Sequence, residues 1–213
     1  MAHAEIMVRT PCPHVSRCCQ WLPADPGWMP GTPPDEEELD GAPRWARAAV
    51  VAAGAALQRL DFAYRGGHAD GAASVRMPLT DRVASFASSR TSPSVLVAGT
   101  EAGGLHCVEA GAEGDMRALW SARVSSAISD VAMDGRRIAC ACADGAVVVL
   151  DAESAARGDD GVSVACEARG HARLAVRWAG GDSLVTASLG VGVELIDIRQ
   201  KPHAPAPARA AFA

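Results

Sequence analysis

Short apolar segments separated by glycine and aspartate fill residues 83–199 of the chain. The segments have the length of β-strands, are rich in Val, Ile and Leu, and show no helical period of 3.6 residues. Glycine-containing turn sequences join three successive pairs of them, which predicts three hairpins. The paired segments are 94–98 with 105–108, 136–142 with 146–150, and 183–187 with 193–196. The pattern predicts an all-β fold of short antiparallel strands.

Two sequence markers recur along the chain with a similar spacing. An aliphatic residue followed by an acid occurs at Leu60-Asp61, Val108-Glu109, Leu150-Asp151 and Ile196-Asp197, and the acids are 48, 42 and 46 residues apart. A large apolar residue ends the triplets Cys19-Gln20-Trp21, Ala84-Ser85-Phe86, Val131-Ala132-Met133 and Val176-Arg177-Trp178. The last three of these large residues are 47 and 45 positions apart. A repeat of about 40–45 residues is typical of a four-stranded propeller blade, so we predict about four blades, with each acid ending a strand.

The first repeat is longer than the others because it holds an acidic, proline-rich segment. Residues 23–43 contain six acidic residues, no Lys or Arg, and six of the 13 prolines, which predicts an insertion looping from the first blade. Blades then occupy residues 1–200, and the Ala/Pro-rich tail 201–213 is the start of a missing blade or disordered. We expect the N-terminal part of a seven-bladed ring, with the other blades lost from a truncated gene model or supplied by a partner.

Charge and cysteine content argue against several kinds of partner. The net charge is −5, of which residues 23–43 carry −6, and the near-neutral remainder has no basic stripe that would favour nucleic-acid binding. No apolar stretch reaches the roughly 20 residues of a membrane span, and no secretion signal is visible, so we expect a soluble, intracellular protein. The seven cysteines are odd in number and lack paired C-x2-C spacing, which predicts buried thiols and no metal site.

The acidic residues have the wrong distribution for catalysis. Asp61, Asp151 and Asp197 recur once in each repeat, whereas a catalytic pair is a single constellation, so we interpret them as turn-capping residues. The chain has no G-x-S-x-G sequence, and its glycine-rich stretches lack the Lys-Ser/Thr ending of a P-loop. We therefore predict no enzymatic activity and no cofactor.

The period and the signposts together resemble the WD-repeat family. In the fourth unit, Gly170-His171 lies 26 residues before Asp197, as a Gly-His pair precedes Trp-Asp in that family. The resemblance implies that His171 joins a hydrogen-bond network inside a blade. The repeats depart from the family because the Trp is replaced by Leu60, Val108, Leu150 and Ile196.

Three segments are similar to the WD-repeat nucleoporins of the Y-shaped outer-ring complex of the nuclear pore. They are residues 15–23 running into the acidic loop, residues 95–103, and residues 183–187 leading to 194–200. This resemblance implies a non-enzymatic scaffold subunit that docks on other outer-ring nucleoporins. It also implies a location in the nucleus, at the pore and nuclear envelope, with a cytoplasmic location as the alternative.

A second function is indicated by Ile196-Asp197-Ile198-Arg199. These residues resemble the Trp-Asp-x-Arg box by which some WD-repeat proteins dock on the adaptor of a cullin-type ubiquitin ligase, where the Arg supplies bidentate hydrogen bonds. The alternative is therefore a substrate receptor of such a ligase, or an adaptor of another complex. Trp28, in the acidic loop, either anchors a partner or packs back onto the blade.

Overall fold

The computed structural model describes residues 19–21, 46–65, 68–89, 92, 94–111, 115–158, 162–167 and 170–200. These residues form four separate antiparallel sheets, and in each sheet the strands are hydrogen-bonded in chain order. The expectation of an all-β fold is confirmed. The insertion 23–43, the tail 201–213 and Trp28 lie outside the described residues.

Each of the first three sheets has four strands. The first sheet contains β1 (Cys19–Trp21), β2 (Ala46–Ala52), β3 (Ala56–Arg65) and β4 (His68–Pro78). The second contains β5 (Val83–Ser88), β6 (Val95–Thr100), β7 (Gly104–Ala110) and β8 (Met116–Arg123). The third contains β9 (Ile128–Asp134), β10 (Arg137–Cys142), β11 (Val147–Asp151) and β12 (Val162–Cys166).

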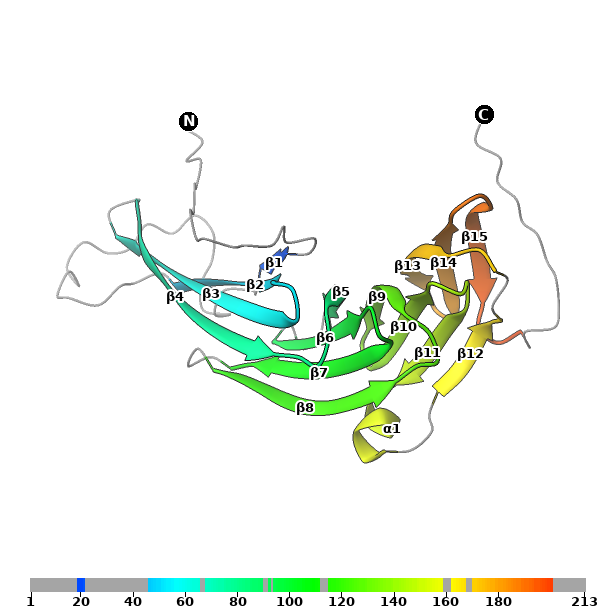
Figure 1. Ribbon diagram of the computed structural model, residues 1–213, viewed down its shortest axis with the longest axis horizontal. Coiled ribbons are helices and arrows are strands. Elements are labelled where there is room, and N and C mark those ends of the chain that lie inside the picture. The colour runs from blue at the N-terminus through cyan, green and yellow to red at the C-terminus, as the bar shows by residue number, and fades with distance from the viewer. Residues whose placement is uncertain are drawn as a thin grey trace.

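The fourth sheet has three described strands, β13 (Arg173–Gly180), β14 (Ser183–Ser188) and β15 (Gly192–Asp197). The sheets follow one another along an arc, from the cyan first sheet to the orange fourth sheet (Figure 1). The first strand of the third sheet, β9, contacts the first strands of both neighbours, β5 and β13. The first strands thus line the inner side of the arc.

Three apolar interfaces hold the sheets together. One cluster joins the first and second sheets through residues such as Leu57 and Phe86, and a second joins the second and third sheets through Leu105 and Ile138. The third cluster joins the third and fourth sheets through residues that include Val147, Val176 and Leu184. Face-to-face packing of this kind buries both faces of a sheet that lies between two other sheets.

Burial along the strands reports which faces are covered. Five of the six residues of β10 and four of the five of β11 are buried, because the third sheet has a neighbour on each face. Burial in β14 alternates between buried and half-buried residues. An alternating strand is covered on one face, so the fourth sheet packs on the third and leaves its other face open.

Both repeat markers occupy fixed positions in the sheets. The four triplets ending in Trp21, Phe86, Met133 and Trp178 lie on the first strands, and the four acids lie on the third strands. The prediction that each acid ends a strand is wrong for Asp61, because β3 continues to Arg65 in register with β4, and for Glu109, because β7 continues to Ala110.

The three predicted hairpins are confirmed, and no strand end differs from its predicted position by more than two residues. In the turn after β10 the positive φ falls on Gly145 alone (φ 92°), while the Asp144 carboxylate accepts a 2.9 Å bond from the Ala146 N–H. The short helix α1 (Ala152–Arg157) was not predicted. Its signal is local: Asp151 accepts bonds from the Glu153 and Ser154 N–H groups, and Gly158 ends the helix in the left-handed region.

Candidate interaction site

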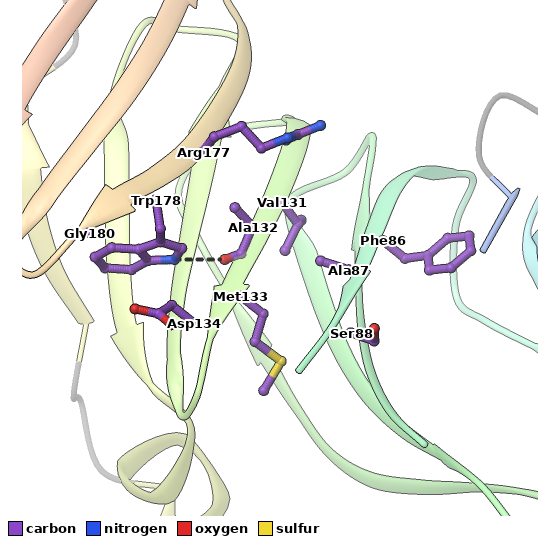
Figure 2. Close-up of a pocket in the computed structure, with 10 residues that line it drawn as sticks. All are labelled: Phe86, Ala87, Ser88, Val131, Ala132, Met133, Asp134, Arg177, Trp178 and Gly180. Atoms are coloured by element: carbon purple, nitrogen blue, oxygen red, sulfur yellow. Dashed lines mark hydrogen bonds between the residues drawn. The ribbon is translucent and has the colours of Figure 1, made fainter. Parts of the chain in front are cut away.

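A cavity of about 360 Å³ opens where the first strands β5, β9 and β13 end. Figure 2 shows residues of these three strands around it, with Phe86 on one side and Trp178 on the other. Its lining is Phe86, Ala87, Ser88, Val131, Ala132, Met133, Asp134, Arg177, Trp178 and Gly180. The sequence triplets supply three large apolar lining residues, Phe86, Met133 and Trp178, because the triplets lie on the first strands.

The buried carboxylate of Asp130 fastens the three inner strands together. The Ser85 hydroxyl of β5 donates to its Oδ1 at 2.7 Å, and the Val176 N–H of β13 donates to its Oδ2 at 3.0 Å. The guanidinium of Arg177 pairs with the same carboxylate. Because a first strand has no strand partner on its inner edge, Asp130 takes the place of a backbone acceptor there.

Trp178 makes a second link between the third and fourth sheets. Its indole Nε1 donates to the Ala132 carbonyl at 3.3 Å (Figure 2). The guanidinium of Arg137 lies 4.4 Å from the centre of the ring, a cation–π distance. Asp134 and Asp182 fix Arg137 in that position, with N–O distances of 2.8 and 3.0 Å.

Asp182 connects this cluster to the predicted docking residues. Besides Arg137, it lies 3.8 Å from the Nε of Arg199. Arg199 donates to both carboxylate oxygens of Asp197, at 3.0 and 2.7 Å, and its backbone N–H adds a third bond. These bonds lower the pKa of Asp197 to about 2 and raise the pKa of Arg199.

Ile196 and Arg199 differ in their access to solvent. Ile196 packs against the interface between the third and fourth sheets, so its side chain is directed away from a partner on the open face. The Arg199 side chain is 71% exposed and keeps N–H groups that Asp197 does not use. Of the predicted contact residues that the structure describes, Asp197 and Arg199 are therefore the ones brought together at the surface.

The other acidic markers lie in separate places. Asp151 caps α1 and pairs with Arg136 at 2.9 Å, and Glu109 pairs with Arg117 at 2.7 Å. For Asp61 the structure describes only the backbone, which pairs with Ala48 and Ala73. The markers thus do not form one site; they recur once per sheet.

The expected role of His171 is wrong, since this residue is exposed in the loop before β13. The buried position belongs to Arg173, which is 2% exposed. Its guanidinium donates to the Gly145 carbonyl at 2.8 Å, to the Thr186 hydroxyl, to the Cys166 sulfur at 3.1 Å and to Glu194 at 2.8 Å. The bend at Gly170 (φ 73°) leaves His171 outside and allows Arg173 to enter.

Sequence reasoning overlooked Asp130, Arg137, Arg173 and Asp182 as site residues. Arg137 and Asp182 lie in or beside the short turns 134–137 and 180–183, which contain positive-φ glycines Gly135, Gly180 and Gly181. Turn sequences of this kind could therefore have indicated where charged side chains cluster. The cross-sheet role of Asp130 had no local signal, because its partners are 45 or more residues away.

The described residues offer little for nucleophilic or metal chemistry. Burial raises the pKa of the Cys107 and Cys142 thiols to about 11 and raises that of Cys140 further, so these thiols are protonated at neutral pH. Ser121 contacts His106 at 3.0 Å, but the other ring nitrogen of His106 faces the Thr80 hydroxyl rather than a carboxylate. Across the described ranges, no three His, Cys, Asp or Glu side chains are grouped to hold a metal ion.

The site combines an open cavity, the Trp178 side chain and arginines held in ion pairs, of which Arg177 and Arg199 are exposed. Among the described elements, no helix has the length and apolar character to cross a bilayer. No protein-family model matches the chain, and no curated protein is significantly similar to it.

Proposed function

We propose that the chain is a non-enzymatic scaffold and protein–protein interaction module, built as a partial WD-repeat β-propeller of four blades. Four consecutive antiparallel sheets, each with its strands in chain order, support the proposal. The first strands of the second, third and fourth sheets contact one another in order on the inner side of the arc, as the inner strands of propeller blades do around an axis.

The observation that carries the proposal is a set of equivalent positions on the third strands. Leu57, Leu105 and Val147 each lie four residues before the acid marker of their own sheet, and each is fully buried against the following sheet. The positions that repeat in the sequence are thus the same positions that repeat in the packing between sheets. Such agreement is typical of blades, in which every unit buries its neighbour's face.

The specific role that we propose is a scaffold subunit of the outer-ring complex of the nuclear pore, at the nuclear envelope. The proposal rests on the sequence likeness of residues 183–187 and 194–200, which lie on β14 and β15 or directly after them. Other outer-ring nucleoporins are the proposed partners, with no cofactor, no nucleic acid and no membrane insertion. The cavity and the Arg137–Asp182–Arg199 cluster are the proposed contact region.

One observation favours the alternative of a cullin-ligase substrate receptor. The exposed guanidinium of Arg199 is held in a fixed orientation by Asp197, as a bidentate docking arginine would need to be. The same arginine also serves the nucleoporin proposal as a rim contact. An experiment that replaces Arg199 is therefore needed to distinguish the two functions.

Affinity purification of the tagged full chain from cells tests both functions. The nucleoporin proposal predicts co-purification of outer-ring subunits and a fluorescent rim around the nucleus. Arg199→Ala is the test variant, and Arg117→Ala, another exposed ion-paired arginine on β8, is its matched control. Recovery of a ligase adaptor that Arg199→Ala abolishes and Arg117→Ala preserves, without a nuclear rim, would overturn the nucleoporin proposal in favour of the ligase receptor.

A further inference from the structure

The fourth sheet has no fourth strand among the described residues. Its order is β13-β14-β15, whereas β4, β8 and β12 complete the other three sheets. In each of those sheets the fourth strand pairs antiparallel with the outer edge of the third strand. The third strand of the fourth sheet, β15, instead forms the outer edge of the last sheet of the arc (Figure 1).

The register of β15 shows which backbone groups face this outer edge. The Ile198 N–H donates to the Asp182 carbonyl at 2.9 Å, in line with the pairing of β14 and β15. Because alternate residues of an antiparallel strand bond to the same neighbour, Ile196 also bonds to β14. The N–H and C=O groups of Val193 and Leu195 therefore point outward, where no described strand pairs with them.

β15 lacks two features that commonly protect an edge strand. Its six residues include no Pro or Lys, and its ladder with β14 runs without a bulge. By contrast, a bulge interrupts the outermost ladder of each four-stranded sheet, at residues 62–64 of β3, 107–108 of β7 and 147–148 of β11. A regular, unprotected edge readily pairs with another extended chain.

The side chains beside this edge favour an apolar partner. Val193 and Leu195, four and two residues before the acid marker, are 43% and 57% exposed. In the second sheet the equivalent positions lie opposite Ala122 and Trp120 of β8, which pack against the apolar cluster there. A segment that pairs with β15 is therefore expected to carry apolar side chains at two alternate positions.

The residues that follow β15 in the sequence are poorly suited to this position. Residues 201–213 contain Pro202, Pro205 and Pro207 and no Val, Ile or Leu. Proline has no N–H to donate to a ladder, and alanine, the commonest residue of this segment, is depleted in strands. A separate polypeptide is therefore the favoured source of the strand.

From these observations we infer that β15 binds an extended segment of a partner protein, which adds to the fourth sheet as an antiparallel fourth strand. The segment has at least five residues, the length of β12, and places apolar side chains opposite Val193 and Leu195. Backbone hydrogen bonds supply the affinity, and the alternate side chains supply the specificity. The inference rests on the proposed function as a protein–protein interaction module, but it does not depend on the Arg199 cluster.

Amide exchange and peptide binding of the full chain, both followed by NMR, test the inference. The probe is a synthetic peptide with the sequence of residues 116–123, the fourth strand of the second sheet. In the chain alone, the Val193 and Leu195 amide protons should exchange at least about tenfold faster than those of Glu194 and Ile196. The peptide should bind with a Kd below about 1 mM, slow the exchange of Val193 and Leu195, and shift the resonances of β15.

Two variants of Leu195 show whether this edge is the binding site. Leu195→Pro removes an outward N–H and should weaken peptide binding about threefold to tenfold. Leu195→Lys keeps the backbone, introduces a charge at the edge and should also weaken binding, so it replaces the proline variant if that variant does not fold. Leu119→Lys, at a 41% exposed position on β8, is the matched control and should bind the peptide as the wild type does.

Three results would overturn the inference. One is slow exchange of the Val193 and Leu195 amides in the chain alone, which would mean that the chain itself covers the edge. The others are no peptide binding at about 1 mM and binding that Leu195→Lys leaves unchanged. These results are independent of the affinity purification, in which absence of outer-ring subunits despite normal peptide binding would count against the nucleoporin role alone.

Discussion

Two charged residues, Asp130 and Arg173, join neighbouring sheets in this molecule. Asp130 binds groups of β5 and β13, and Arg173 binds the Gly145 carbonyl and the Cys166 sulfur in the third sheet from its place on β13. Both are buried, and each satisfies backbone or side-chain groups that the sheets themselves leave without a strand partner. The stability that each residue contributes therefore depends on how many hydrogen bonds are lost together when it is replaced.

Replacing Arg173 with alanine should destabilise the protein strongly. The change removes a buried charge with four partners and leaves Glu194, whose side chain is 22% exposed, without its 2.8 Å ion pair. Breaking a buried pair from one side costs about 3–5 kcal/mol. Urea unfolding measures this free energy, and the exposed Arg117→Ala control should lose less than about 1 kcal/mol. Similar losses in both variants would show that Arg173 is not a central link.

Asp197 should titrate well below an ordinary aspartate. Its pKa is about 2, against a usual value of 3.8, first because of the hydrogen bonds from Arg199. Since the folded pKa is depressed, the ion pair stabilises the fold above about pH 4 and is lost as the pH falls towards 2. Carboxyl-carbon NMR should show this pKa, and Arg199→Ala should return it towards 3.8. An unchanged titration in that variant would contradict the pairing.

At the scale of elements, the packing of neighbouring sheets depends on how closely their backbones approach as well as on apolar side chains. Gly99 of β6 faces β9, and a β-carbon at this position would lie 2.6 Å from the Ile128 Cγ2 atom and 2.7 Å from the Val131 Cγ2 atom. The second and third sheets thus approach closely at Gly99, where the sequence has no β-carbon.

Gly99→Ala should therefore push the second and third sheets apart. Overpacking of this kind costs about 1–3 kcal/mol in unfolding free energy. Ile128→Ala alone should cost about 2–5 kcal/mol by leaving a cavity. The double variant should lose clearly less than the sum, because the added methyl group occupies space that Ile128 vacated. Strict additivity in urea unfolding would mean that the two residues do not meet.

At the scale of the whole molecule, the sequence period was sufficient to predict the order of the sheets. The spacing of Phe86, Met133 and Trp178 located first strands, and the acid markers located third strands. The contacts between sheets were not predictable. Asp130 and Arg173 act through partners distant in sequence, and the exposure of His171 depends on a bend that no repeat marker encodes.

If successive sheets stack face to face along an arc, methyl-NMR distance contacts will report that stacking. Cross-peaks are expected from the Gly99 α-protons to the Ile128 and Val131 methyl groups, and from the Trp178 indole N–H to Ala132. No backbone ladder is expected between β8 and β9, which belong to different sheets. Absence of the methyl contacts, together with a continuous hydrogen-bonded ladder from β8 into β9, would contradict the stacked arrangement.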